Sequence, residues 1–333
     1  MTIKIAINGF GRIGRCTLRA LFESGRDDIE IVAINDLAPA DHLAHLLKYD
    51  SVHGMFQRDV SVKGDTLVID GREIRLTAMP NPADLHWGDV DIALECTGRF
   101  NSRDQAAAHL ENGSKRVLVS APASKADRTV VYGVNHHDLT SADMVVSNAS
   151  CTTNCLAPVA KVLDDAFGLA TGYMTTIHAY TGDQPSHDRD HSDLYRARAC
   201  ALSMVPTSTG AARAISLVLP HLEGRLEGSA IRVPTANVSL VDLSFMPERT
   251  ATVAAVNAAI ETAANGGLMG VLGYEEAPLV SSDFNHNPLS SIFAPAQTNV
   301  TSAGLVRVVS WYDNEWGFSN RMLDTAAHMG GLI

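Results

Sequence analysis

The sequence predicts an α/β protein of two domains, the first built on a doubly wound parallel sheet and the second an α+β domain with a mostly antiparallel or mixed sheet. The length of 333 residues exceeds what a single hydrophobic core ordinarily serves. Apolar strand segments alternate with helical segments through residues 1–150, a pattern typical of parallel sheets. Beyond residue 170, strand segments follow one another with few helices between them, which favours antiparallel pairing.

The first strand and the first helix enclose a glycine-rich turn. Residues 3–8 form an apolar strand, Gly9, Gly11 and Gly14 follow in the spacing G-x-G-x-x-G, and residues 15–22 continue as a helix. Glycines at these positions permit a tight turn and let the backbone approach a pyrophosphate at the helix N-terminus. In this context the pattern indicates a Rossmann-type nucleotide-binding fold. A purely structural glycine turn is the alternative interpretation.

The second strand ends in an acidic residue. Residues 29–34 form the strand, Asn35 follows, and Asp36 stands 22 positions after Gly14. A carboxylate at this strand end accepts hydrogen bonds from the adenosine ribose hydroxyls and repels a 2′-phosphate. The sequence therefore predicts NAD rather than NADP as the cofactor. A surface aspartate beside a structural turn is again the alternative.

The alternation of strand and helix continues after Asp36. We expect a helix at 41–49, short strands at 60–62, 66–69 and 74–77, a strand at 90–95, a helix at 102–110 and a strand at 116–120. Ligands of such sheets bind at the carboxyl ends of the strands. Thr97, Gly98 and Ser120 fall on that edge and could contact the cofactor, although small polar residues at a strand end also form turns without any ligand.

Composition and charge exclude several classes of protein. The formal net charge of −11 opposes sequence-independent binding to nucleic acid, which depends on Lys and Arg that neutralise phosphates. No apolar run approaches the roughly 20 residues that span a bilayer, and no signal-peptide core precedes the first strand. We therefore expect neither a nucleic-acid nor a membrane partner, and we expect a cytoplasmic location.

The five cysteines have no paired zinc spacing and indicate neither a disulfide framework nor a metal site.

The segment 147–155 places a cysteine among polar neighbours at the junction of a strand and a helix. Residues 144–146 form a short apolar strand, and residues 155–167 carry apolar side chains at helical spacing, so Cys151 falls in the first helical turn. The helix dipole and the unpaired N–H groups there favour an anion, and we expect the Cys151 thiol to ionise more readily than an ordinary thiol. Cys151 is therefore a candidate nucleophile. A structural, buried cysteine is the alternative.

The second domain is expected to supply the partners of this cysteine. A strand at 171–178 ends at His178, and an imidazole there can take a thiol proton and return it. Arg198 and Arg232 could bind an anionic group, or could form surface ion pairs. The remaining expected elements are a helix at 209–219, strands at 229–233 and 238–245, a helix at 252–265, strands at 298–300 and 305–312, and a helix at 315–329.

The polar segment 179–203 is longer than an ordinary connecting loop, and a loop of this length in a compact enzyme is expected to have a function. Its acidic and imidazole side chains lack a fixed ligand spacing, which favours a solvated or subunit-contacting loop over a metal site. These side chains are His187, Asp188, Asp190, His191 and Asp193.

A nucleotide domain combined with an activated thiol indicates oxidation of an aldehyde. A thiolate can attack the carbonyl carbon, and the resulting hemithioacetal can give a hydride to a nicotinamide and become a thioester.

Five stretches together carry a resemblance to a known family. They are residues 8–15 (NGFGRIGR), 147–155 (SNASCTTNC), 206–212 (PTSTGAA), 232–237 (RVPTAN) and 311–317 (WYDNEWG). Over essentially the whole chain, the sequence resembles phosphorylating glyceraldehyde-3-phosphate dehydrogenase of the bacterial type. The resemblance implies an NAD-dependent oxidoreductase of glycolysis and gluconeogenesis. It would convert glyceraldehyde 3-phosphate and inorganic phosphate to 1,3-bisphosphoglycerate through a thioester.

The resemblance also implies roles for individual residues, with Cys151 as the nucleophile and His178 as its base. The residues that would hold the substrate phosphate or the inorganic phosphate are Ser150, Thr152, Thr181, Arg198, Thr209, Gly210 and Arg232. Those that would contact NAD are Arg12, Ile13, Asp36, Ser120 and Asn314, with Asn314 orienting the nicotinamide amide.

At the level of domains, the resemblance implies a homotetramer with residues 179–203 at a subunit interface. Residues 151–314 would form the catalytic and tetramerisation domain. The C-terminal helix, within residues 315–333, would return to the NAD-binding domain of residues 1–150 and complete it.

Two alternatives to this function remain at the level of sequence. Erythrose-4-phosphate dehydrogenase shares the cysteine motif and the ending 313–317, but HAYT at 178–181 and TSTGAA at 207–212 favour the triose substrate. A thiol redox sensor or interaction protein is the alternative of another class. Cys151 and Cys155 are four residues apart, so they share a helix face and could form a bridge under oxidation.

Overall fold

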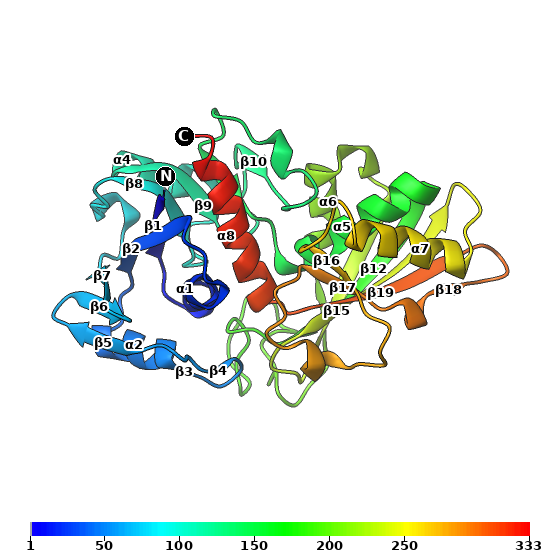
Figure 1. Cartoon of the computed structure of the whole chain (residues 1–333). Coiled ribbons are helices and arrows are strands. Elements are labelled where there is room, and N and C mark those ends of the chain that lie inside the picture. Colours follow the sequence, from blue (N-terminus) through cyan, green and yellow to red (C-terminus); the bar gives the residue numbers. More distant parts are fainter. Residues whose placement is uncertain (1) are drawn as a thin grey trace. The chain divides into compact units, whose positions relative to one another are not determined.

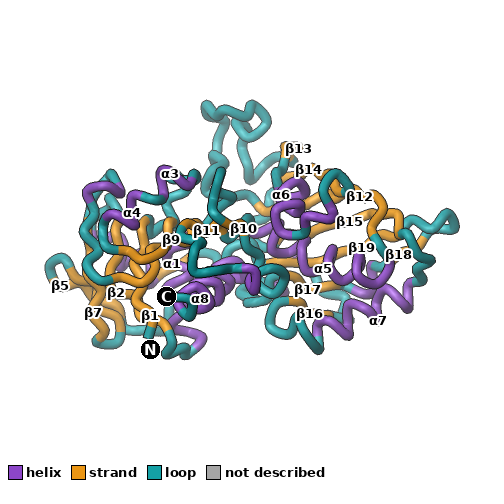
Figure 2. Tube along the Cα trace, turned by 90° about the horizontal axis from the view of Figure 1, so that it is seen from above, coloured by secondary structure: helices purple, strands orange, loops and turns teal. Residues whose placement is uncertain are grey.

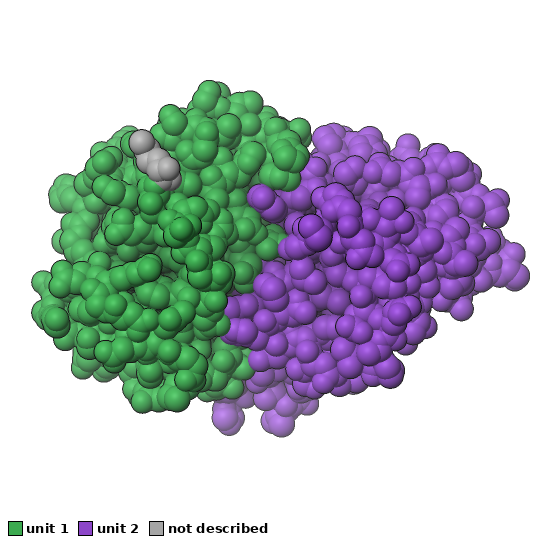
Figure 3. Space-filling view, viewed as in Figure 1, with its two compact units in different colours: residues 1–130, 136–149, 319–333 green, residues 131–135, 150–318 purple. Residues whose placement is uncertain are grey.

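The computed structural model describes residues 2–333, and its elements are labelled in Figure 1. The chain forms two compact units (Figure 3). Unit 1 contains the residues up to Val130, His136–Ala149 and Ser319–Ile333, and unit 2 contains Val131–Asn135 and Ser150–Phe318. The domain limits 1–150, 151–314 and 315–333 stay a prediction, and the compact units differ from them at 131–135, at 150 and at 315–318.

Unit 1 is built on a sheet with the strand order β10-β11-β9-β8-β1-β2-β7-β6-β5. The strands that pair in parallel are β1 (Ile3–Asn8), β2 (Ile29–Asn35), β7 (Arg72–Thr77), β8 (Val90–Glu95), β9 (Ser114–Val119), β10 (Arg128–Thr129) and β11 (Val145–Ser147). Two antiparallel strands, β5 (Val60–Lys63) and β6 (Thr66–Ile69), extend one edge. The predicted doubly wound parallel sheet is confirmed, with β1 between β2 and β8.

The longer helices of unit 1 are α1 (Arg12–Ser24) and α2 (Ala40–Lys48), and α8 (Trp316–Gly330) belongs to unit 1 from Ser319 onward. Its minor elements are β3 (Tyr49–Asp50), β4 (Gly54–Met55), η1 (Pro82–Asp84) and η2 (His136–Asp138). One prediction was wrong, because the helix expected at 102–110 is two short helices, α3 (Arg103–Ala106) and α4 (Ala108–Glu111). Leu110 N–H donates to Ala107 O, only three residues back, and this tighter bond interrupts the α-helix.

Unit 2 is built on a mixed sheet with the strand order β13-β14-β12-β15-β19-β17-β16, and β18 pairs with β19. Its strands are β12 (Leu169–Ala179), β13 (Val205–Ser208), β14 (Leu226–Val233), β15 (Ser239–Pro247), β16 (Leu272–Tyr274), β17 (Ser291–Phe293), β18 (Asn299–Val300) and β19 (Val306–Tyr312). Strands β12 and β14 are parallel, whereas β15 runs antiparallel to both β12 and β19. The predicted mixed sheet is confirmed.

Three helices pack on the sheet of unit 2 (Figures 1 and 2). They are α5 (Cys151–Phe167), α6 (Ala211–Val218) and α7 (Val253–Ala264), with the short turns η3 (Pro220–Leu222), η4 (Ser281–Phe284) and η5 (Pro295–Gln297) in the connections. Helix α5 packs on β12, β15, β17 and β19 and also contacts α6 and α7. Apolar side chains that leave the sheet on the other side, such as Tyr173, Ile231 and Met246, are exposed.

Residues 180–204, all of them described, form turns and loops without a helix or a strand. Ion pairs hold this segment locally, since Arg198 contacts Asp188 and Arg196 contacts Asp183. None of the helices within residues 2–333 is both long and apolar enough to cross a bilayer.

Candidate active site

Cys151 is the first residue of α5, the position that the sequence predicts. Ser150 is the N-cap of this helix, and its Oγ accepts a hydrogen bond from Thr153 N at 3.1 Å. Ala149, just before the cap, has a φ of +56°, a left-handed conformation that residues other than glycine seldom adopt. The helix start is therefore set by a capping side chain and by an unusual backbone turn.

His178, near the end of β12, lies beside this cysteine. Its Nε2 is 3.5 Å from the Sγ of Cys151. Its Nδ1 is 2.6 Å from the carbonyl oxygen of Ala179 and 3.0 Å from Nη1 of Arg232. The carbonyl oxygen can only accept and is the closer of the two, which favours the tautomer in which Nδ1–H donates to it. Nε2 is then the unprotonated nitrogen and faces the thiol. The geometry is that of a base next to a nucleophile.

The protonation states of this pair follow from burial and from one nearby cation. Burial raises the pKa of the Cys151 thiol, and the positive charge of Arg232 only opposes that rise. Burial and then Arg232 lower the pKa of His178 to about 3. These shifts run against the expected ready ionisation of the thiol, because the loss of solvation opposes the favourable helix terminus. Both shifts favour the uncharged forms of the two groups.

Arg232 stands next to His178, because the two residues are register partners on the parallel strands β14 and β12. Its Nη1 donates to the carbonyl oxygen of Ala179 at 3.0 Å and lies 3.5 Å from the Oγ1 of Thr181. Its buried Nε has no hydrogen-bond partner within the described part of the chain. A guanidinium group with an unused, buried N–H is suited to bind an anion.

The structure places Arg198 beside Asp188 and shows no contact of its side chain with His178 or Arg232, so its role in binding phosphate stays a prediction. The Nε of Arg198 donates to Asp188 Oδ2 at 2.7 Å, and the side chain is 65% exposed. Arg196 lies close enough to His178 and Arg232 for its charge to affect both. Its Nε donates to Thr207 Oγ1 at 3.1 Å. After burial, the charge of Arg196 also lowers the pKa of His178 and of Arg232. No periodicity could have distinguished the two arginines, because they lie in a loop without regular structure.

The other predicted phosphate-binding residues lie around the same strands and helix ends of unit 2. Thr209 Oγ1 accepts a hydrogen bond from Ala211 N at 3.2 Å, and Gly210 is the N-cap of α6. Thr152 lies in a buried chain of hydroxyl groups, since its Oγ1 is 2.8 Å from the hydroxyl of Tyr312, which is also 2.8 Å from Thr176 Oγ1. This chain of hydroxyl groups connects the first turn of α5 to β12 and β19.

The glycine turn of unit 1 can be tested for its fit to a dinucleotide. Gly9 has a φ of +90°, and a Cβ there would lie 2.6 Å from Thr97 N. A Cβ on Gly14 would lie 2.3 Å from the carbonyl oxygen of Gly9. At Gly11, the N-cap of α1, a Cβ would meet no atom of the described residues within 4 Å. The turn is thus packed tightly on the protein side and open above the helix N-terminus, which fits a bound pyrophosphate.

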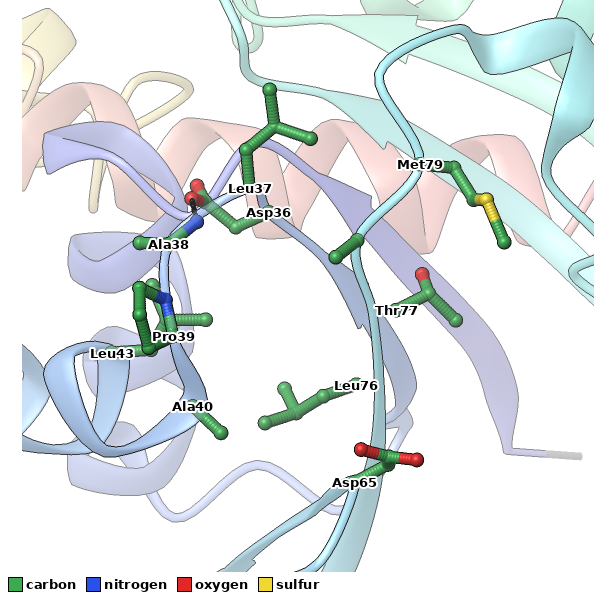
Figure 4. A pocket seen from close by; sticks show the side chains of 11 residues that line it. Asp36, Leu37, Ala38, Pro39, Ala40, Leu43, Asp65, Leu76, Thr77 and Met79 are labelled. Carbon is green, nitrogen blue, oxygen red and sulfur yellow. Dashed lines mark hydrogen bonds between the residues drawn. The ribbon is translucent and has the colours of Figure 1, made fainter.

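Asp36 lies at the carboxyl end of β2, between two hollows. Its Oδ2 accepts from Phe10 N at 2.7 Å and its Oδ1 from Ala38 N at 3.0 Å, which leaves each oxygen a further lone pair. A pocket of about 240 Å³ includes Asn8, Gly9, Gly11, Asn35, Met79, Pro80, Cys96, Thr97, Arg99 and Phe100 besides Asp36 and Leu37. Figure 4 shows the second pocket, which has a volume of about 450 Å³. Its carboxylates are those of Asp36 and Asp65, and its other side chains are mainly apolar.

The remaining predicted cofactor residues lie in or near secondary-structure ends. Arg12, in the first turn of α1 with Ile13, forms an ion pair with Asp50. Ser120 follows β9 and its N–H donates to the Glu95 carbonyl at 3.0 Å, while Thr97 N donates to Glu95 Oε1 at 2.9 Å. Gly98 has a φ of +69°. Asn314 follows β19 in unit 2, and its Oδ1 accepts a hydrogen bond from the hydroxyl of Ser239 at 3.0 Å.

A parallel sheet with a dinucleotide-type glycine turn, joined to a mixed-sheet unit that carries a cysteine beside a histidine, defines a two-domain dehydrogenase. Residues 3–103 match the family model described as "Glyceraldehyde 3-phosphate dehydrogenase, NAD binding domain", and residues 150–314 match "Glyceraldehyde 3-phosphate dehydrogenase, C-terminal domain". The chain belongs to the glyceraldehyde-3-phosphate dehydrogenase family. It is an NAD-dependent oxidoreductase, and both the resemblance and the predicted cofactor are confirmed.

Individual relatives match the whole chain. A protein named glyceraldehyde-3-phosphate dehydrogenase from Cereibacter sphaeroides is 64% identical and is covered over 100% of both chains. One of the same name from Xanthobacter flavus is also 64% identical with 100% coverage of both. The protein of that name from Geobacillus stearothermophilus is 54% identical over 99% of this chain and 98% of its own.

Proposed function

We propose that this chain oxidises glyceraldehyde 3-phosphate with NAD and inorganic phosphate to give 1,3-bisphosphoglycerate, a step of glycolysis and gluconeogenesis. The observation that carries the proposal is the 3.5 Å approach of His178 Nε2 to the Sγ of Cys151. Relatives that are named glyceraldehyde-3-phosphate dehydrogenase and are 64% identical to this chain support the choice of substrate. The proposed location is the cytoplasm.

In the proposed mechanism, the Sγ of Cys151 bonds to the aldehyde carbon while its proton passes to Nε2 of His178. The Nδ1–H bond to the Ala179 carbonyl keeps the ring in the tautomer that can accept this proton. Bound NAD supplies the hydride acceptor that makes the reaction an oxidation. The Cys151 thioester is then cleaved by an oxygen of inorganic phosphate, and the departing sulfur recovers its proton from His178.

Phosphate recognition is proposed to depend on Arg196 and Arg232. Two guanidinium groups near each other repel, and the charge of Arg196 contributes, after burial, to the lowered pKa of Arg232. An anion between them would relieve this repulsion and use the N–H groups that remain available. The proposed set is completed by Ser150, Thr152, Thr181, Thr209 and Gly210.

Arg196→Ala is expected to raise the KM for glyceraldehyde 3-phosphate by about 10- to 100-fold, because a charge-assisted contact to the phosphate is lost. Arg198→Ala provides a matched control, since this side chain is exposed and pairs with Asp188. Steady-state kinetics with both variants checks the assignment. An effect confined to Arg198→Ala would contradict it and restore the original prediction.

For the cofactor, we propose that Gly9, Gly11, Arg12 and Ile13 hold the pyrophosphate and that Asp36 binds the adenosine ribose. Thr97, Gly98 and Ser120 would complete the pocket in unit 1. Asn314 would contact the nicotinamide amide. The open space at Gly11 and the unused lone pairs of Asp36 support these roles.

Asp36→Ala is expected to improve the ratio of kcat/KM for NADP to that for NAD by about 10- to 100-fold, because a carboxylate no longer repels the 2′-phosphate. Asp65→Ala serves as the control. Asp65 lines the pocket of about 450 Å³ but not the pocket of about 240 Å³, whereas Asp36 lines both. Kinetics with both cofactors checks the prediction. If Asp36→Ala leaves the preference unchanged, Asp36 does not face the ribose.

A homotetramer is also proposed. The loop of residues 180–204 exposes Leu194, Leu202 and Met204 by 80%, 83% and 76%, and the sheet of unit 2 exposes Tyr173. Apolar surface of this extent favours association with further copies of the chain. Sedimentation analysis tests this proposal, and a monomer at working concentration would contradict it.

One assay tests the proposed reaction against its alternatives. The protein is mixed with glyceraldehyde 3-phosphate or erythrose 4-phosphate, with NAD or NADP, with and without inorganic phosphate, while reduced nicotinamide is followed. We expect the highest rate with the triose phosphate, NAD and phosphate together. Preference for the tetrose would support the erythrose-4-phosphate dehydrogenase alternative.

The redox-sensor alternative is disfavoured by the surroundings of Cys155. Cys155 is 0% exposed, and its Sγ lies 3.3 Å from Ser291 Oγ. Burial raises the pKa of this thiol to about 12, so it lacks the thiolate character of an oxidisable cysteine. In the same preparation, peroxide-dependent loss of thiols without any turnover would favour the sensor.

A further inference from the structure

We propose that Ser239 is a positioning residue that determines which end of the Asn314 amide is presented to the nicotinamide. The inference rests on the proposed function, because it concerns how Asn314 recognises the cofactor. Ser239 begins β15 and Asn314 follows β19, the antiparallel neighbour of β15 in unit 2.

The hydroxyl group of Ser239 has two contacts that together assign its proton. Its Oγ accepts from Ala179 N at 3.0 Å and lies 3.0 Å from Oδ1 of Asn314. Ser239 is 1% exposed, so its O–H must find an acceptor within the protein. The amide oxygen of Asn314 satisfies it. With the amide reversed, the serine oxygen would face two donors and its own proton would be left without an acceptor.

This arrangement leaves the Nδ2 of Asn314 as the group that meets a ligand. Within residues 2–333, the Asn314 side chain makes no other hydrogen bond. Its two N–H groups can only donate, so the partner on the cofactor must be an acceptor. The carbonyl oxygen of the nicotinamide carboxamide is such an acceptor, whereas the NH₂ group of the same carboxamide is not.

The backbone on both sides of the pair is held in place independently. Val238 has a φ of +67°, an outlier for a β-branched residue, and it is buried in a cluster with Phe284 and Ile292. Asn237 Nδ2 donates to Asp313 Oδ2 at 2.8 Å. The strained segment 237–239 therefore contacts residues 313 and 314 in succession, which leaves the Asn314 side chain little freedom.

The same hydrogen bonds connect Asn314 to the catalytic histidine through Ala179, whose N–H and carbonyl groups belong to the two peptide groups on either side of its Cα. The carbonyl oxygen of Ala179 accepts from Nδ1–H of His178 and from Nη1 of Arg232. Its N–H donates to Ser239, and Ser239 donates to Asn314. The backbone of one residue, Ala179, is thus held on one side by the base and its neighbouring guanidinium group and on the other side by Ser239.

Equilibrium binding of two cofactors tests this inference without relying on turnover. NAD and its 3-acetylpyridine analogue both carry a carbonyl group attached to the pyridine ring. In NAD this carbonyl belongs to a carboxamide with an NH₂ group, whereas the analogue has a methyl group in place of the NH₂. In Ser239→Ala the amide can reverse, and its oxygen then repels the carbonyl of the analogue while it still accepts from the NH₂ of NAD. We expect the affinity for the analogue to fall about three- to tenfold more than that for NAD, measured by calorimetric titration.

Two further variants make the result decisive. Ser290→Ala removes a hydroxyl that is also buried, at 3% exposure, and has no partner within the described residues, so it should leave the ratio of affinities unchanged. Asn314→Asp replaces the donor by an acceptor of the same shape and should also penalise the analogue more than NAD, even if Ser239→Ala folds poorly. Equal losses for both cofactors in both test variants would overturn the inference. Failure of the unsubstituted protein to bind NAD would instead refute the proposed function.

Discussion

Replacing Cys151 with serine is expected to lower the phosphate-dependent formation of NADH by about 10⁴-fold or more. The hydroxyl of serine is far harder to ionise than a thiol. His178 cannot compensate, because burial and the charge of Arg232 lower its pKa to about 3, which makes it a weak base for an alcohol. The rate is measured with saturating triose phosphate, NAD and inorganic phosphate.

Cys155→Ser is the matched control for this experiment. Cys155 is on the same helix but is buried against Ser291 and Ser310, and a serine can make the same hydrogen bonds. We expect this variant to keep most of the parent activity. A Cys151→Ser protein that retains more than about one per cent of the parent rate would rule out the thioester mechanism.

His178→Asn is expected to lower kcat by about 10²- to 10⁴-fold, the usual contribution of a general base. The dependence on pH should change as well. In the parent, His178 is neutral at any pH above about 3 and can accept the proton throughout the neutral range. In the variant, the reaction must wait for the thiolate, whose pKa burial holds above the ordinary value. Its rate should therefore rise about tenfold per pH unit through the neutral range.

A second histidine of unit 2 provides the control. His221 is largely exposed, and its Nε2 lies 2.9 Å from Asp164 Oδ2, among residues that are not part of the proposed site. His221→Asn should leave both kcat and the shape of the pH profile unchanged. A flat profile in His178→Asn between pH 6 and 9 would mean that another group takes the thiol proton.

The features that could be predicted from the sequence are those that depend on near neighbours in the chain. The glycine turn lies between β1 and α1, Asp36 directly follows β2, and Cys151 begins α5. Each is set by a strand end, a helix start or a backbone conformation within a few residues. The strands β13, β16 and β17, of three or four residues each, were missed because so short a segment carries too little periodicity.

By itself, then, the sequence determined the two kinds of sheet and the nucleotide turn, because local patterns specify each of them, and it predicted Cys151 and His178 as nucleophile and base. Only the tertiary structure decided that Arg196 rather than Arg198 stands near Arg232, and that burial raises the pKa of the Cys151 thiol. Only the tertiary structure brought Ser239 to Asn314, 75 positions along the chain. These outcomes depend on solvation and on contacts between segments that are distant in the sequence. Neither produces a periodic pattern of residues from which it could be predicted.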